Sequence, residues 1–211
     1  MDQSLIPPDK RESVTPSLYL TRLALPLSDA WQAEQVASFT PSERARLARI
    51  SRPQRRAQFV MAHCMLRPAL ASAGADNAIV DVDADGRVQL HAQPPVYASI
   101  SHSQEFVATI AASDPVGVDL ECMSPKWDPG EAARMLELSS VDADTPDAIL
   151  RAWVTAEARL KAGLKASPQV WLSSWQGCQL AVAGISNPPL TGVFDAMTGI
   201  YNVSALKWNA V

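Results

Sequence analysis

Alternation of apolar and polar positions, which is typical of half-buried strands, recurs in several segments of the chain. We expect strands at residues 18–27, 79–83, 88–91, 96–100, 106–112 and 115–121, and further strands within the last 40 residues. Gly86 supplies the turn of a hairpin between the second and third of these strands. Residues 101–105 are polar, and we expect them to form a turn between two strands.

Apolar residues recur at three- and four-residue spacing between these strands, and this spacing predicts helices. The pair Ser28-Asp29 and the segment Thr40-Pro41-Ser42-Glu43 are typical sequences of a helix N-terminus. We expect helices at residues 29–39, 41–52, 54–72, 131–138 and 146–164. The order of strands, helices and strands, repeated once, predicts an α+β protein of two halves.

The composition is that of an ordinary globular protein, with 47% hydrophobic and 19% charged residues. No apolar run has the length that spans a membrane, and the N-terminal residues lack the layout of a signal peptide. Cys64, Cys122 and Cys178 are isolated from one another. We therefore expect reduced thiols and a cytoplasmic protein that does not bind membranes.

The charges are unevenly distributed along a chain whose net charge is −4. Residues 44–67 contain seven arginines and no acid, whereas residues 114–147 contain nine acids and two basic residues. The arginine segment is either an anion-binding surface or a solvated helix face. We expect no nucleic-acid binding, because the protein is acidic and Phe59 is the only aromatic residue of that segment.

Two carboxylates stand two residues apart in the segment Gly117-Val118-Asp119-Leu120-Glu121. Side chains at this spacing on a strand point to the same face, so Asp119 and Glu121 project together. Neighbouring carboxylates repel unless a cation joins them, and carboxylate oxygens suit magnesium. The alternative is an exposed strand face with two acids that have no function.

Two further segments carry polar groups that can act on a ligand. Glu157 and Lys161 lie one helical turn apart, as either part of a site or a surface ion pair. Ser99-Ile100-Ser101-His102-Ser103 can gather donors around a phosphate. A serine hydrolase is disfavoured, because no glycine elbow surrounds these serines.

The order of an arginine-rich helix, Ser-Ile-Ser-His-Ser, Gly-Val-Asp-Leu-Glu and Trp-x-x-x-Glu-Ala-x-x-Lys resembles the 4′-phosphopantetheinyl transferases, particularly the Sfp-type superfamily. The resemblance covers about residues 39–165. It implies two pseudo-symmetric α/β halves of similar topology, packed together as a monomer with the active site at their interface. We place the halves at residues 1–112 and 113–211. The implied reaction transfers 4′-phosphopantetheine from coenzyme A to a serine of an apo acyl or peptidyl carrier protein, requires Mg²⁺ and releases 3′,5′-ADP.

The resemblance also implies roles for the acidic residues and the lysine. Asp119, Glu121 and Glu157 match the residues that hold the magnesium ion. Glu157 also matches the position of a base for the serine hydroxyl, acting directly or through a metal-bound water. Lys161 matches the lysine that steadies the phosphates and the leaving 3′,5′-ADP.

The remaining implied roles concern binding of coenzyme A. His102 matches the histidine that contacts the 3′-phosphate, with Ser101 beside it. Arg46 and Arg56 are expected on the 3′-phosphate or adenine side, because arginine forks onto phosphate oxygens. Arg87, which follows Gly86, aligns with the basic residue of a Gly-Lys/Arg-Pro motif.

Three positions depart from the family pattern. Ala156 stands where a lysine usually precedes the catalytic glutamate, Val154 replaces a Thr or Ser, and Val88 replaces a Pro. The segment between Glu121 and Trp153 is also short. These departures keep open a second reading, in which a degenerate relative binds coenzyme A or a carrier protein with little or no transfer.

Overall fold

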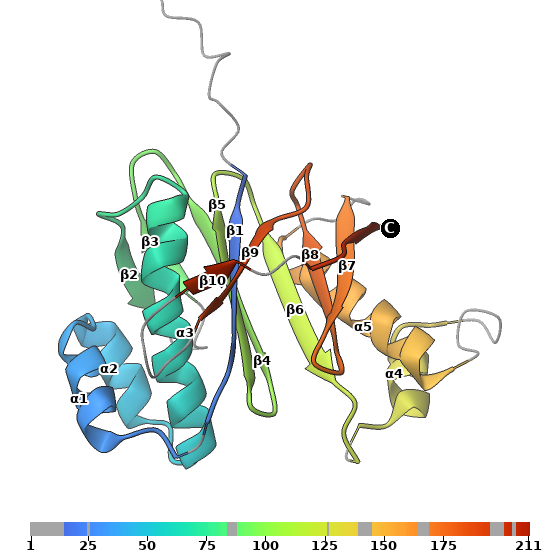
Figure 1. The fold of residues 1–211 in the computed structure, drawn as a ribbon, viewed down its shortest axis with the longest axis horizontal. Coiled ribbons are helices and arrows are strands. Elements are labelled where there is room, and N and C mark those ends of the chain that lie inside the picture. Colours follow the sequence, from blue (N-terminus) through green and yellow to red (C-terminus); the bar gives the residue numbers. More distant parts are fainter. Residues whose placement is uncertain are drawn as a thin grey trace, which may run out of the picture.

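The computed structural model describes residues 15–24, 26–83, 88–125, 127–138, 145–163, 169–194, 201–203 and 206–211. The predicted turn at Gly86 and the site residue Arg87 lie outside these ranges. Figure 1 shows helices on the outer sides of two sheets that lie against each other. The mixed α+β class predicted from the pattern is confirmed, whereas the pseudo-symmetry of two halves stays a prediction.

The first sheet contains five of the described strands, in the order β10-β9-β1-β5-β4. Their bounds are Ser17–Arg22 for β1, Tyr97–Ser103 for β4, Phe106–Ala112 for β5, Leu190–Phe194 for β9 and Tyr201–Val203 for β10. β1 pairs antiparallel with β5 and parallel with β9, so strands from both ends of the chain meet at β1. The division of the chain at residue 112 stays a prediction.

The second sheet contains four described strands in the order β11-β7-β8-β6. They are Gly117–Cys122 for β6, Val170–Trp175 for β7, Cys178–Ala183 for β8 and Asn209–Ala210 for β11. A separate hairpin pairs β2 (Ile79–Val82) with β3 (Val88–His91). β4 and β6 each end the order of their own sheet, and these two edges lie side by side.

The helices are α1 (Asp29–Ala37), α2 (Pro41–Ala48), α3 (Pro53–Ser72), α4 (Pro129–Met135) and α5 (Pro146–Lys161). α3 packs on the first sheet and α5 packs on the second, each through a buried apolar face. No helix of the described part is long and apolar enough to cross a membrane.

One apolar core joins the two sheets. Its members come from both, with Leu20 and Ile110 on the first sheet and Val118, Leu120 and Leu180 on the second. All five of these side chains are fully buried. The layers therefore follow the order α3, first sheet, second sheet, α5.

The local signals for helix starts are confirmed. Ser28 accepts a hydrogen bond from the backbone N–H of Trp31 at the start of α1. Thr40 and Glu43 form the reciprocal capping box at the start of α2. The turn expected at residues 101–105 is wrong at its start, because β4 continues to Ser103 and the backbone reverses at Gln104, whose φ is 51°.

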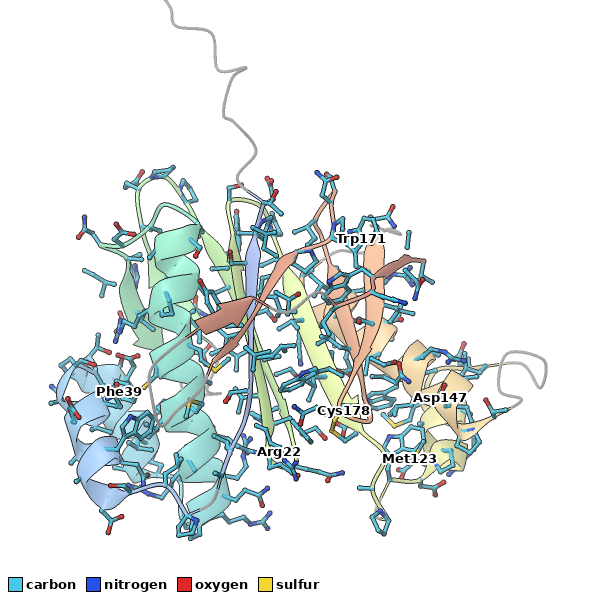
Figure 2. The ribbon with its side chains drawn as sticks, viewed as in Figure 1. Arg22, Phe39, Met123, Asp147, Trp171 and Cys178 are labelled. Atoms are coloured by element: carbon cyan, nitrogen blue, oxygen red, sulfur yellow. A yellow bond between two sulfur atoms is a disulfide. The ribbon has the colours of Figure 1, made fainter. Side chains whose placement is uncertain are left out.

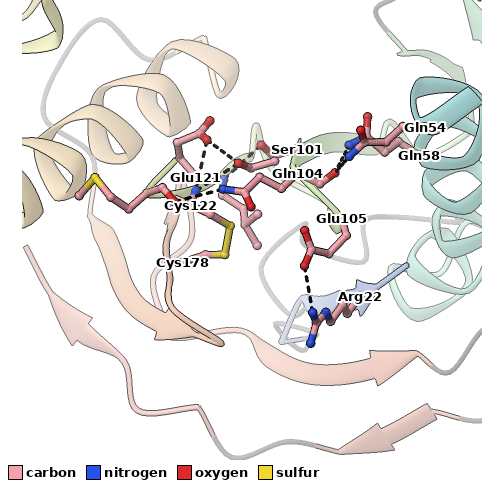
Figure 3. Close-up of a disulfide and its surroundings, with 12 residues drawn as sticks. Arg22, Gln54, Gln58, Ser101, Gln104, Glu105, Glu121, Cys122 and Cys178 are labelled. Atoms are coloured by element: carbon pink, nitrogen blue, oxygen red, sulfur yellow. Dashed lines mark hydrogen bonds and ion pairs between the residues drawn. A yellow bond between two sulfur atoms is a disulfide. The ribbon is translucent and has the colours of Figure 1, made fainter. Parts of the chain in front are cut away.

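The expectation of reduced thiols is wrong for two of the three cysteines. Cys122 and Cys178 form a disulfide between β6 and β8, where they are directly opposed in the strand register (Figures 2 and 3). Cys64 is free and half-buried. The two bonded residues are 56 positions apart, so only the pairing of the strands brings them together. A cytoplasmic location stays a prediction.

Candidate functional site

Alternate serines of β4 join the edges of the two sheets. An edge strand leaves backbone N–H groups without a partner strand, and each needs another acceptor when it is buried. The hydroxyl oxygens of Ser99, Ser101 and Ser103 accept hydrogen bonds of 3.0, 3.1 and 3.1 Å from the N–H groups of Val118, Leu120 and Cys122, respectively. The side chains of β4 therefore take the place of a neighbouring strand's carbonyl groups. This bonding also explains why β4 continues through the segment expected to be a turn.

Two of these serines also orient the carboxylates of β6. Ser101 donates to Asp119 Oδ1 at 2.8 Å, and Ser103 donates to Glu121. Asp119 is only 5% exposed. Each of these hydroxyls thus accepts from the backbone and donates to a carboxylate, which fixes both partners. Figure 3 shows Glu121 beside the disulfide and the bonded strand edge.

The surroundings of Glu121 shift its ionisation. Burial raises the pKa of Glu121 above its usual value, and the hydrogen bonds from Ser103 and from the Cys122 backbone only partly offset this rise. The negative charge of Asp119 raises the pKa of Glu121 further, while Lys161 lowers it. A cation that binds between the carboxylates would relieve the repulsion that is visible in this shift.

Lys161 connects the last turn of α5 to the carboxylates. Its Nζ lies 2.6 Å from Asp119 Oδ1 and 3.3 Å from both Ser101 Oγ and the Val118 carbonyl oxygen. The lysine side chain is 30% exposed, so one end of this ion pair is open to ligands. Gly117 permits the approach, because a Cβ there would lie 2.6 Å from the backbone nitrogen of Ala162.

Glu157 lies one helical turn before Lys161 and is half-buried. Among the described residues it forms no hydrogen bond or ion pair. No three His, Cys, Asp or Glu side chains of the described part are arranged to hold a metal ion, so Glu157 does not group with Asp119 and Glu121. The pair Asp119 and Glu121 has the hard oxygen donors that magnesium prefers. Glu157 as a third ligand stays a prediction.

A pocket of about 690 Å³ opens beside these groups. Its lining comes from α2, α3, β3, β4 and α5, and its cationic or ionisable members are Arg46, Arg55, His63, His102 and Lys161. No Asp or Glu is among the described residues that line it. Several cations gathered in one concave site without acids produce a field that attracts anions.

Arg55 and His102 form a polar wall of this pocket. Arg55 Nη1 donates to the His102 imidazole, 2.8 Å from Nδ1. Burial and the charges of Arg55 and Lys161 lower the pKa of His102 to about 4. Burial, together with the charge of Arg46, also lowers the pKa of Arg55. A bound phosphate would oppose both shifts, because an anion favours the charged forms.

The turn after β4 is fixed to the elements on either side of it. The carbonyl oxygen of Gln104 accepts from Gln54 (2.7 Å) and from Gln58, both on α3 (Figure 3). The Gln104 side chain donates to the Met123 carbonyl oxygen just beyond β6 (3.1 Å). The pocket wall and the carboxylate strand are therefore held to one another at the turn.

The structure brings together most of the residues expected at the site, but not all of them. Arg46, His102 and Lys161 line the pocket, and Ser101 bonds to both Asp119 and Lys161. Arg56 does not line it. Its guanidinium donates to the carbonyl oxygens of Leu47 (2.8 Å) and Ile50 (3.3 Å) at the end of α2.

Sequence reasoning missed Arg55, which takes the place expected for Arg56. Neighbouring residues of a helix point about 100° apart, so only one of the two arginines can face the pocket. Arg55 lies four residues before Phe59, and both line the pocket. The four-residue spacing between Arg55 and Phe59 could have indicated that Arg55 faces the pocket, since residues four apart share a helix face.

A scan of the chain against protein-family models finds no match, and no curated protein matches it either.

Proposed function

We propose that this protein is a 4′-phosphopantetheinyl transferase that moves the phosphopantetheine group of coenzyme A to a serine of an apo acyl or peptidyl carrier protein. One observation carries the proposal. Lys161 belongs both to the acid-free cationic pocket and, through its 2.6 Å contact with Asp119, to the carboxylate pair of β6. A cationic pocket that adjoins a carboxylate pair suits a substrate with several phosphates and a bound divalent cation.

Coenzyme A offers phosphates to both parts of this arrangement. Its 3′-phosphate matches the wall formed by Arg46, Arg55 and His102, where guanidinium groups and an imidazole present N–H donors. Its pyrophosphate matches Lys161, whose ammonium group stands between the pocket and Asp119. This placement puts the bond that must break beside the carboxylates.

Magnesium fits the chemistry of the donors on β6. Asp119 and Glu121 would hold it, and the ion would neutralise charge that develops on the pyrophosphate oxygens. Ser101 and Ser103 orient these two carboxylates by hydrogen bonds from their hydroxyls. The serines thereby limit the carboxylate rotamers, which favours a preformed site.

The proposed transfer exchanges one phosphorus–oxygen bond for another. The hydroxyl oxygen of the carrier's serine bonds to the phosphorus that carries pantetheine. The bond from that phosphorus to the oxygen bridging the two phosphates breaks, and 3′,5′-ADP leaves with the bridging oxygen. The proton of the hydroxyl needs an acceptor, for which Glu157 is our candidate because its carboxylate has no partner among the described residues.

A mass measurement on the carrier tests this proposal. The pure protein is incubated with coenzyme A, magnesium and each of several apo carrier proteins, and the carriers are weighed by mass spectrometry. We expect one carrier at least to gain the mass of phosphopantetheine, and 3′,5′-ADP to appear in equal amount. The Asp119→Asn variant serves as the control, and it should give no gain.

A second candidate function is binding of coenzyme A or of a carrier protein without efficient transfer. The observation in its favour is that the described carboxylates do not form a three-ligand metal group. Ala156 in place of a lysine also removes one positive charge near the expected pyrophosphate. Calorimetry separates the two functions, since tight binding of coenzyme A with no mass gain on any carrier would favour the binding protein.

A further inference from the structure

One histidine that lines the pocket is paired with a buried glutamate, and the proposed reaction uses neither of them. His63 of α3 is 3% exposed and Glu43 of α2 is 0% exposed. His63 Nδ1 lies 2.7 Å from Glu43 Oε1, and Arg67 donates to Glu43 Oε2 at 3.0 Å. Glu43 on α2 thus fixes the orientation of the His63 ring on α3.

The partners of Glu43 determine which nitrogen of the histidine carries a proton. Burial alone raises the pKa of Glu43, but the hydrogen bonds from His63 and from the Thr40 backbone, together with the charge of Arg67, lower it below its usual value. Glu43 is therefore a carboxylate and can only accept, so Nδ1 of His63 is the donor. When the ring is neutral, its other nitrogen, Nε2, is an acceptor.

The ring of His63 lines the pocket, and its Nε2 is free to bond. It has no hydrogen-bond partner in the part of the chain that the structure describes. The one side-chain nitrogen or oxygen atom there that is both sealed from solvent and without a partner is Arg159 Nε. Nε2 is therefore accessible, and the ring it belongs to lines the 690 Å³ pocket. An unpartnered ring nitrogen of a nearly buried residue that lines a cavity is a suitable acceptor for a ligand's N–H group.

The surroundings of this nitrogen select a flat and largely apolar group. Phe59 stacks on His63 with ring centroids 4.1 Å apart. Ile50, Ala62 and Val88 also line the pocket. Arg55 stands eight residues before His63 on the same helix, which is about 12 Å along the axis. The pocket therefore has a cationic wall at one position, and further along the helix apolar side chains surround the His63 ring.

We infer that His63, held by Glu43, is a specificity residue of this pocket, and that its Nε2 accepts a hydrogen bond from the exocyclic amino group of a nucleotide base. The inference rests on the proposed function, in which the base is the adenine of coenzyme A. A base with a carbonyl oxygen at that position would place this acceptor against Nε2 of His63, which is also an acceptor, so such a base is disfavoured. The pocket thus distinguishes amino-substituted from oxo-substituted purine nucleotides.

Calorimetric titration of the wild-type protein with two nucleotides tests this inference without any variant. Adenosine 3′,5′-bisphosphate and inosine 3′,5′-bisphosphate carry the same phosphates and differ at the exocyclic group. We expect the adenosine compound to bind about tenfold more tightly, the ratio that one net hydrogen bond supplies. Equal affinities would overturn the role of His63 but leave the nucleotide pocket standing. Binding of neither compound would overturn the proposed function as well.

Two variants then assign the preference to His63. His63→Asn keeps an N–H near the position of Nδ1 for Glu43 and removes the distal nitrogen. His91→Asn is the matched control, because the His91 side chain is 63% exposed and does not line the pocket. We expect the tenfold preference for the adenosine compound to disappear in His63→Asn and to persist in His91→Asn. A folded His63→Asn protein that keeps the preference would overturn the inference.

Discussion

Replacement of Gly117 by alanine is the sharpest test of how the site is held together. Gly117 starts β6, the strand that carries Asp119 and Glu121, and it lies against the last turns of α5. A Cβ at this position would lie 2.6 Å from the backbone nitrogen of Ala162 and closer still to the carbonyl oxygen of Ala158. Both atoms belong to backbone, so a side-chain rotation cannot relieve the clash.

The size of the effect follows from these distances. Ordinary contacts of a Cβ begin at 3.4 Å, so the Ala162 nitrogen alone requires a movement of about 0.8 Å, and the closer Ala158 carbonyl oxygen requires a larger one. Overpacking of a tight contact costs about 1–3 kcal/mol of unfolding free energy. The same movement displaces Lys161, which is 2.6 Å from Asp119 Oδ1. A misplacement of about 1 Å reduces a rate by about 10²-fold.

Urea unfolding and the carrier mass assay measure the two effects separately. The control is Gly192→Ala, because a Cβ at Gly192 would lie 3.5 Å from the Tyr19 ring, an ordinary contact. We expect Gly117→Ala to lose about 1–3 kcal/mol of unfolding free energy, and the control to lose none or to gain up to about 1 kcal/mol. If Gly117→Ala matched the control in stability and in transfer rate, the close packing of α5 on β6 would not position Lys161.

Three further outcomes are expected. Ser99→Ala and Ser101→Ala should each lower the unfolding free energy in urea by about 1–3 kcal/mol, because each leaves a buried N–H unbonded. Of these two variants, Ser101→Ala alone should slow transfer in the carrier mass assay, since Ser101 donates to Asp119 whereas Ser99 donates to no carboxylate among the described residues. His102 has a pKa of about 4, below the roughly 6.5 of an unfolded chain, so it stabilises the fold above pH 6.5 and this stability is lost as the pH falls toward 4. Thermal melts between these pH values should therefore show a steeper decline for wild type than for His102→Gln, and parallel curves would refute the assigned shift. Asp119→Asn should abolish transfer at every magnesium concentration in the carrier mass assay and keep a cooperative unfolding transition; near-normal activity would remove Asp119 from the site.

Features with a local physical cause could be predicted from the sequence. The cap at Thr40 needs only the three residues that follow it, and the structure contains the expected capping box. The orientation of Asp119 and Glu121 follows from the two-residue repeat of a strand, and both receive hydroxyl groups from the same neighbouring strand.

Features that depend on contacts between distant segments could not be predicted in the same way. Ser101 and Ser103 look like turn residues until β6 lies beside them and supplies N–H groups. Cys122 and Cys178 become neighbours only when β6 pairs with β8. Arg55 rather than Arg56 lines the pocket because of the way α3 is rotated about its own axis against the first sheet. That rotation is determined by the buried residues along the whole helix.

A crystal structure of the protein with coenzyme A and magnesium tests the central claim most directly. We predict density for the adenosine 3′-phosphate against Arg55 and His102, and for the pyrophosphate beside Lys161, with a metal ion on Asp119 and Glu121. Density for coenzyme A elsewhere on the protein, with the pocket and the carboxylate pair unchanged, would contradict the claim.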